Sequence, residues 1–151
     1  GNENFSGKLL GGCIESLYSI ISGDRFSEQK EICEKYNIFP SAEEWKDKIL
    51  FIETSEGKSS PEEYEKMLNT LKEKVIFDSL GGIIVGKPQN EVYYEEYKKI
   101  LCKVVNNPDI PIVYNVNFGH AYPRCILPYG INVEYRHSEK KFIFNEPLFS
   151  E

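Results

Sequence analysis

The chain has 151 residues, a formal net charge of −6 and no cluster of lysine and arginine residues. This length suits one domain with a substantial core. The missing basic cluster argues against nucleic acid as a partner, because phosphate-backbone binding draws most of its free energy from such cations. No apolar run approaches the roughly 20 residues needed to cross a bilayer, and the polar opening lacks the parts of a secretory signal. We therefore expect a cytoplasmic protein with neither nucleic acid nor membrane as a partner.

The four cysteines are widely spaced and form no C-x-x-C pair, which argues against a zinc knuckle or a redox motif. We expect reduced structural thiols, as is usual in the cytosol. These cysteines are Cys13, Cys33, Cys102 and Cys125.

The first part of the chain predicts one strand, one helix and a long connection. Residues 1–7 carry no regular pattern and are expected to be a disordered leader or a cloning remnant, so that the domain spans 8–151. Residues 8–12 predict a strand that enters a glycine turn, and a helix should follow and end at Gly23. The stretch 24–45 lacks a clean period and predicts a connection with one or two short helices.

The middle of the chain predicts strands that alternate with helices. Ser60 and Pro61 are typical of a helix start, because the hydroxyl caps the first turn and proline fits its geometry. The expected elements are, in order, a strand at 49–52, a helix from 61 to about 74, a buried strand at 81–86, a helix at 91–105 and a buried strand at 111–116. This alternation predicts a mostly parallel central sheet.

The end of the chain has a different pattern. Residues 131–135 and 141–144 alternate between apolar and polar side chains around a polar turn, which predicts an antiparallel hairpin. The whole sequence therefore predicts an α/β domain with helices over a mixed sheet.

Two of the predicted strands end in residues that suit acid–base chemistry. Glu53 follows the strand at 49–52, and His120 follows the strand at 111–116. Loops at the carboxyl ends of parallel strands meet at one edge of the sheet, so the two side chains can meet there. A histidine takes a proton from a hydroxyl when a carboxylate fixes its tautomer, and Glu53 is the candidate for that role.

The pattern leaves other interpretations open. Glu56, Glu62 and Glu63 compete with Glu53 as the orienting carboxylate, although most of them should be solvated side chains at a helix start. Glu53 could cap the turn before the helix at Pro61 while His120 bonds a backbone carbonyl. The second histidine, His137, lies in a charged turn and is expected at the surface.

A nucleophile is missing from the pattern, because no serine lies in a G-x-S-x-G elbow. Cys13 is the best internal candidate, since it follows two glycines and begins a helix whose N–H groups would lower a thiol pKa. A buried structural thiol is the competing interpretation. A metal site formed by Glu53, His120 and Cys13 is a further alternative, and a non-catalytic interaction module is another.

Five motifs follow one another along the chain: Gly11-Gly12-Cys13-Ile14-Glu15-Ser16-Leu17, Ile49-Leu50-Phe51-Ile52-Glu53-Thr54-Ser55-Glu56, Ile84-Val85-Gly86-Lys87-Pro88, Asn117-Phe118-Gly119-His120 and Leu127-Pro128-Tyr129-Gly130. In this order the sequence resembles the carboxyl-terminal domain of LD-carboxypeptidase-like serine peptidases, and more closely their microcin C self-immunity branch. One departure is Asn117, where relatives often carry Asp.

The resemblance implies a Ser-Glu-His triad that is divided between two domains. Glu53 and His120 match the glutamate and histidine positions, whereas the serine belongs to an amino-terminal α/β domain of the same polypeptide that this sequence lacks. The chain alone is then expected to be inactive. The resemblance also implies a compact three-layer β/β/α (swivelling) domain and amide hydrolysis without metal or organic cofactor.

The resemblance narrows the substrate only to a class. The immunity branch acts on peptidyl or aminoacyl nucleotide conjugates in the cytoplasm, and the alternative branch trims muropeptides as an LD-carboxypeptidase. A homodimer of the complete enzyme is a further expectation.

Overall fold

The computed structural model describes residues 4–147 and 149. Its strands form one six-stranded sheet in the order β4-β3-β2-β1-β5-β6. The strands are β1 (Phe5–Cys13), β2 (Ile49–Glu53), β3 (Gly82–Gly86), β4 (Ile112–Val116), β5 (Asn132–Arg136) and β6 (Lys141–Phe144). The α-helices are α1 (Ile14–Ser22), α2 (Gln29–Lys35), α3 (Ala42–Trp45), α4 (Pro61–Glu73) and α5 (Tyr94–Val105), and two short 3₁₀ turns are η1 (Ile76–Asp78) and η2 (Gln89–Glu91).

The long strand β1 joins a parallel and an antiparallel part of the sheet. Its second half, Leu9–Cys13, pairs in parallel with β2, and its first half, Phe5–Lys8, pairs antiparallel with β5. The remaining pairs are parallel for β2–β3 and β3–β4 and antiparallel for β5–β6. The predicted mixed sheet, its helices and its terminal hairpin are therefore confirmed. Because β1 pairs with both β2 and β5, the two sheets of the expected three-layer unit are continuous here and form one six-stranded sheet.

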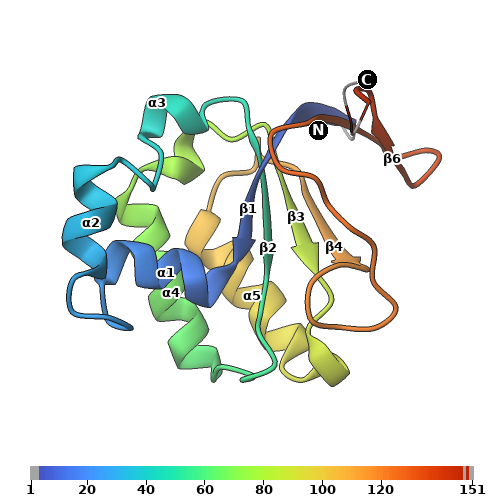
Figure 1. Ribbon diagram of the computed structural model, residues 1–151. Coiled ribbons are helices and arrows are strands. Elements are labelled where there is room, and N and C mark those ends of the chain that lie inside the picture. The colour runs from blue at the N-terminus through green and yellow to red at the C-terminus, as the bar shows by residue number, and fades with distance from the viewer. Residues whose placement is uncertain (1–3, 148, 150–151) are drawn as a thin grey trace.

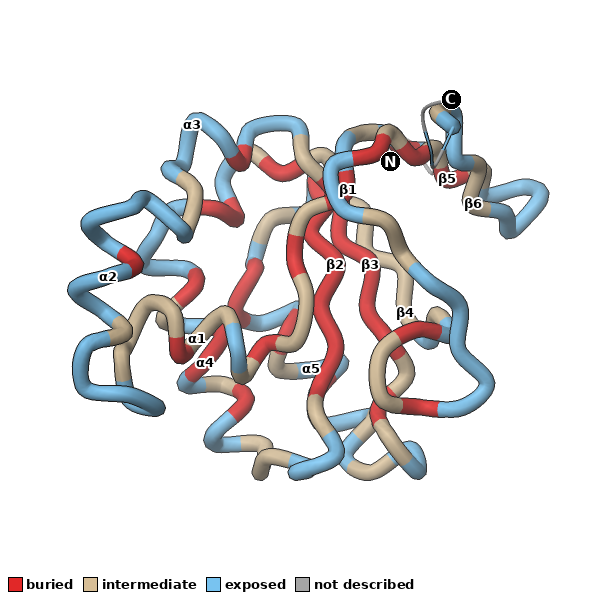
Figure 2. The backbone as a smooth tube through the Cα atoms, viewed as in Figure 1, coloured by how far each residue is buried: buried red, intermediate tan, exposed pale blue. Residues whose placement is uncertain are grey.

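The helices cover one face of the parallel strands, and Figure 1 shows them gathered on that side. The β5–β6 hairpin lies beside the first half of β1, with β6 at the upper right of the view. Alternate residues of β2 divide between two apolar clusters, because successive strand side chains point to opposite faces. Leu50 and Ile52 face α4 and α5, whereas Ile49 and Phe51 pack with Phe118 and the β5 side chains. Figure 2 shows buried backbone along β2 and β3. The β4–β5 connection therefore covers part of the face that the helices leave open.

Local sequence accounts for most helix boundaries. Ser60 accepts a hydrogen bond from the backbone N–H of Glu63, and the Glu63 carboxylate accepts from the backbone N–H of Ser60, which forms a capping box at α4. Gly23 ends α1 in the left-handed region with φ of 72°. One or two short helices were expected between 24 and 45, and the structure has two, α2 and α3. Within the described residues, no helix is both long and apolar enough to cross a membrane.

Three sequence-based expectations are wrong in detail. Phe5–Gly7, assigned to a leader, are strand residues of β1 because they pair with β5; residues 1–3 lie outside the described residues. The helix expected from Glu91 begins at Tyr94, since Glu91 and Tyr93 have positive φ. The strand β4 is half-buried rather than buried, because it lies at the edge of the sheet and pairs only with β3.

Candidate active site

Glu53 is a buried carboxylate at the carboxyl end of the central strand β2. It is the last residue of the strand, lies opposite Cys13 in the register, and is only 7% exposed. Gly86 ends the neighbouring strand β3, and a Cβ atom at that position would lie 2.7 Å from the Glu53 Cβ. The glycine at the end of β3 is therefore what leaves room for the carboxylate.

The turn after β4 brings His120 to the same edge of the sheet. Phe118 is buried and packs edge-on against Phe51 of β2, with ring centroids 5.9 Å apart. Gly119 adopts φ of +82°, and a Cβ atom there would lie 2.5 Å from the Glu53 Oε2. Only glycine permits both this backbone conformation and this close approach. The Phe118 contact anchors the turn, and Gly119 lets it close on the carboxylate.

His120 and Glu53 form a close hydrogen-bonded pair. The distances from His120 Nδ1 to Glu53 Oε2 and Oε1 are 2.8 and 3.0 Å, and the backbone N–H of His120 donates to Oε2 at 3.2 Å. Since an ionised carboxylate can only accept, Nδ1 carries the proton and the ring orientation is determined. The structure thus brings together the two residues that the sequence placed at strand ends.

The outer nitrogen of His120 contacts a second carboxylate. Nε2 lies 2.9 Å from Oε2 of Glu56, whose side chain is 68% exposed. The hydrogen bond that His120 donates to Glu53 raises the pKa of His120 above its ordinary value of 6.5, and the negative charges of Glu53, Glu56 and Glu15 raise it further, whereas burial opposes the shift. These contacts therefore stabilise the charged form of the imidazole relative to its neutral form.

The competing carboxylates have different positions. Glu56 lies at Nε2 and not at the orienting nitrogen, so Glu53 alone of the candidates occupies the Nδ1 side. Glu63 is part of the capping box of α4, and Glu62 is an exposed residue of the first turn of that helix, as expected for carboxylates at a helix start. The interpretation in which Glu53 caps the turn before this helix differs from the structure, where the Glu53 carboxylate accepts from the backbone N–H and Nδ1 of His120.

A cleft of about 730 Å³ opens beside His120. Its wall is formed by the start of α1, the loop after β2 and the first turns of α4. The lining residues are Cys13, Glu15, Ser16, Tyr18, Ser19, Asp24, Arg25, Ser55, Glu56, Gly57, Ser59, Glu63, Lys66, Met67 and His120. This cleft borders the outer side of the imidazole ring, where Glu56 contacts Nε2.

Cys13 does not have the properties of a nucleophile. Burial raises the pKa of its thiol to about 11, and a hydrogen bond to Glu15 raises it as well. The Sγ atom lies 3.0 Å from Oε2 of Glu15. A neutral thiol is a weak nucleophile, so the position at the start of α1 does not activate this cysteine.

Sequence reasoning gave no separate role to Glu15, Gly86 or Gly119. The carboxylate of Glu15 accepts from the backbone N–H of Ser55 and from the hydroxyls of Ser55 and Ser59. The glycine before the histidine of the Phe118-Gly119-His120 motif was a usable clue, because glycine often marks a close backbone approach. The contacts of Glu15 cross 40 residues or more and leave no local pattern.

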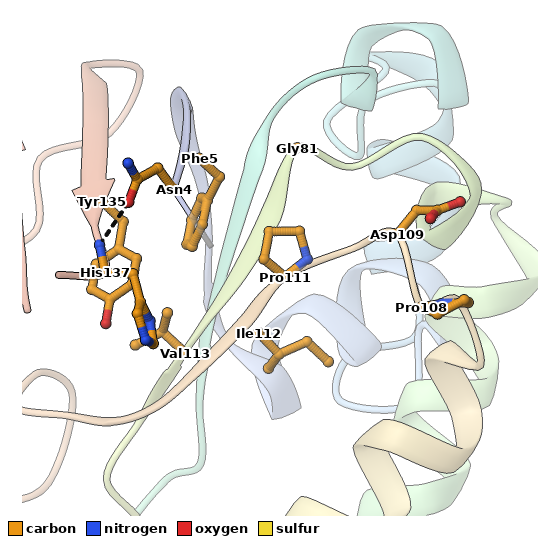
Figure 3. Close-up of a pocket in the computed structure, with 10 residues that line it drawn as sticks. All are labelled: Asn4, Phe5, Gly81, Pro108, Asp109, Pro111, Ile112, Val113, Tyr135 and His137. Atoms are coloured by element: carbon orange, nitrogen blue, oxygen red, sulfur yellow. Dashed lines mark hydrogen bonds between the residues drawn. The ribbon is translucent and has the colours of Figure 1, made fainter. Parts of the chain in front are cut away.

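A second cleft, of about 560 Å³, lies at the opposite end of the parallel strands (Figure 3). His137 lies there at the exposed surface, as expected, and its backbone N–H donates to the side chain of Asn4 at 2.8 Å. Figure 3 shows His137 and Asp109 on opposite sides of this cleft. The carboxyl edge of the sheet is the stronger candidate for catalysis.

The metal interpretation has no support from the geometry. Among the residues that the structure describes, no group of three or more histidine, cysteine, aspartate or glutamate side chains is arranged to bind a metal ion. The proposed ligand Cys13 is instead occupied by its hydrogen bond to Glu15.

Comparison with known proteins identifies the family. Residues 6–135 match the sequence profile of the LD-carboxypeptidase C-terminal domain, and because this match covers most of the chain, the protein belongs to that family. The resemblance that the motifs suggested is thereby confirmed. The family is one of carboxypeptidases, and the chain corresponds to the carboxyl-terminal domain of its members.

Relatives of known structure agree with this assignment. The microcin C7 self-immunity protein MccF of Escherichia coli is 28% identical over 155 residues, covering 99% of this chain and 40% of that protein. An MccF-like protein from Streptococcus pneumoniae, solved in complex with AMP, has a TM-score of 0.91 and 45% identity over 96% of this chain and 42% of its own. An MccF-like protein from Bacillus anthracis has a TM-score of 0.67 and 25% identity over 92% of this chain and 39% of its own. The chain thus spans about two fifths of the length of these relatives.

Proposed function

We propose that this chain supplies the glutamate and the histidine of a Ser-Glu-His triad for amide hydrolysis by a serine carboxypeptidase. The observation that carries the proposal is the contact between the buried Glu53 carboxylate and Nδ1 of His120, at 2.8 Å. This contact determines the tautomer and orientation of the ring and directs Nε2 away from the sheet, toward the cleft.

The serine comes from an amino-terminal α/β domain of the same polypeptide, and it approaches Nε2 of His120. The ring takes the hydroxyl proton as the oxygen attacks the amide carbonyl, and Glu53 stabilises the imidazolium that forms. The same nitrogen then gives the proton to the leaving amine. A water molecule repeats the sequence to release the acyl group and regenerate the serine.

The substrate class is an aminoacyl or peptidyl nucleotide conjugate. The relative from Streptococcus pneumoniae was solved with AMP and is 45% identical to this chain, which favours a nucleotide over a muropeptide as the leaving portion. The alternative, a muropeptide LD-carboxypeptidase, uses the same two residues. Cytoplasmic location, a homodimer of the complete enzyme and inactivity of the isolated chain stay predictions.

The test uses the complete protein and the 151-residue chain side by side. Each is incubated with an aminoacyl adenylate analogue that has an amide-type link and with an L,D-tetrapeptide, and the products are quantified by mass spectrometry. The complete protein should cleave the first compound, and the chain alone should cleave neither. Cleavage by the isolated chain would refute the divided triad.

Two variants of the complete protein test the assigned roles. His120→Asn should lower kcat by about 10⁴- to 10⁶-fold, as loss of the base does in serine hydrolases. Glu53→Gln should lower kcat by about 10⁴-fold, because the ring loses its orienting charge. The matched controls are His137→Asn at the opposite end of the sheet and Glu62→Gln in the first turn of α4, which should both retain wild-type turnover. Wild-type turnover by His120→Asn would disprove the assignment.

A further inference from the structure

Glu15 connects two segments that are far apart in the sequence. Its Oε1 and Oε2 atoms lie 3.1 and 3.2 Å from the backbone nitrogen of Ser55. The hydroxyls of Ser55 and Ser59 donate to Oε1 at 3.0 and 3.1 Å, and the Cys13 thiol lies 3.0 Å from Oε2. One carboxylate therefore joins the start of α1 to the loop between β2 and α4.

A role in its own helix does not explain these contacts. A glutamate in the first turn of a helix is favoured by the helix dipole wherever its side chain points. Among the described residues, however, the hydrogen-bond donors to Glu15 are on Cys13, Ser55 and Ser59 and none is on α1 itself. The carboxylate is directed at the loop, and this direction requires a separate reason.

The loop that Glu15 binds carries Glu56. Ser55 precedes Glu56 directly, and Ser59 follows it by three residues, so the bonds to Glu15 restrain the loop on both sides. Ser59 is restrained further, because the hydroxyl of Tyr97 donates to its backbone carbonyl. A glutamate that is 68% exposed would otherwise sample many rotamers, yet Glu56 lies 2.9 Å from Nε2 of His120.

We infer that Glu15 is a positioning residue for the catalytic histidine, because it fixes the loop at 55–59 so that Glu56 covers the outer nitrogen of His120. The catalytic part of this inference rests on the proposed function, whereas the geometric part does not. When the serine approaches, Glu56 has to leave Nε2. Glu15 thus acts through Glu56 and does not itself touch His120.

Several charged groups around the ring affect the pKa of His120, which is the quantity that the test measures. Glu53 faces Nδ1 from β2, Glu56 faces Nε2 from the following loop, and Glu15 contributes its charge from α1. Arg124 lies on the same loop as His120 and donates to the carbonyl of Gly119 at 3.1 Å. A variant of Glu15 therefore changes both a position and a charge, and these two effects must be separated.

A double-mutant cycle followed by NMR separates them. The chain has two histidines, so a His137→Asn background leaves His120 as the sole imidazole signal. The pKa of His120 is measured in the 151-residue chain with Glu15→Ala, with Glu56→Gln and with both. Each single variant should lower the pKa of His120, and the decrease from Glu15→Ala should be less than half as large when Glu56→Gln is already present.

The opposite outcome is equally definite. Equal decreases in the two backgrounds mean that Glu15 acts only through its charge, and the inference is then wrong. Glu15→Asp is the matched variant, because it keeps the charge but is one methylene too short to reach both Ser55 and Ser59. It should lower the pKa of His120 nearly as much as Glu15→Ala does, and an unchanged value would also contradict positioning.

Two further measurements complete the test. Ser55→Ala combined with Ser59→Ala removes two donors to Glu15 without changing any charge, and it should lower the pKa of His120. This double variant replaces Glu15→Ala in the test if Glu15→Ala is too unstable to measure. In the complete protein, both Glu15→Ala and Glu56→Gln should move the acidic limb of the kcat/KM profile to lower pH. If the wild-type complete protein hydrolyses neither compound, the proposed function is refuted. The NMR result then decides the inference about Glu15 by itself.

Discussion

Replacing Gly119 by alanine tests whether the turn at His120 depends on a glycine. The residue has φ of +82°, and left-handed backbone costs an alanine about 1–2 kcal/mol relative to glycine. The added methyl would also lie 2.5 Å from the Glu53 Oε2, which displaces the carboxylate from His120. Loss of a buried charged hydrogen bond costs about 1–3 kcal/mol. The total expected destabilisation is about 2–5 kcal/mol.

Gly130 provides the matched control for this variant. It has φ of +72°, but among the described residues no atom lies within 4 Å of a Cβ built there. Gly130→Ala should therefore lose only the conformational part, about 1–2 kcal/mol. Urea unfolding followed by the fluorescence of Trp45, which is 1% exposed, gives both values. The reasoning is refuted if Gly119→Ala is no less stable than Gly130→Ala and its His120 pKa equals that of the wild type.

Three further predictions concern the core, the histidine and the thiol. Leu68 is a fully buried residue of α4, and Leu68→Ala should lower the free energy of unfolding in urea by about 2–5 kcal/mol. Ile126 is 90% exposed, and Ile126→Ala should change the same free energy by about 0.5 kcal/mol or less. The folded-state pKa of His120 is raised above 6.5, so its contribution to stability is present below about that pH and lost as pH rises through the folded pKa. The difference in unfolding free energy between the wild type and His120→Asn should accordingly be larger at about pH 6 than at about pH 9, and a difference that grows with pH would contradict the shift. Iodoacetamide should alkylate exposed Cys102 before Cys13, whose pKa of about 11 leaves little thiolate at neutral pH; equal rates by mass spectrometry would show that Cys13 is activated after all.

The elements themselves could be predicted because their causes are local. The hydroxyl of Ser60 and the proline at 61 determine the start of α4 within a few residues of chain, and the structure confirms it. The positions of Glu53 and His120 at strand ends could also be predicted, since parallel strands present their carboxyl ends at one edge. Two of the errors, at Phe5–Gly7 and at β4, occurred where pairing with a distant segment decides the outcome.

The sequence by itself thus determined which residues could act, and it did so through side-chain chemistry and periodicity. It left open which carboxylate faces which nitrogen of His120, because Glu53 and Glu56 are close in the sequence and equal in chemistry. Only the tertiary structure decided this, since the burial of Glu53 beside Gly86 and Gly119 and the restraint of Glu56 by Glu15 depend on contacts between separate segments. Such contacts form where backbone conformation and packing bring separate segments of the chain together, and a local sequence pattern does not specify which segments meet.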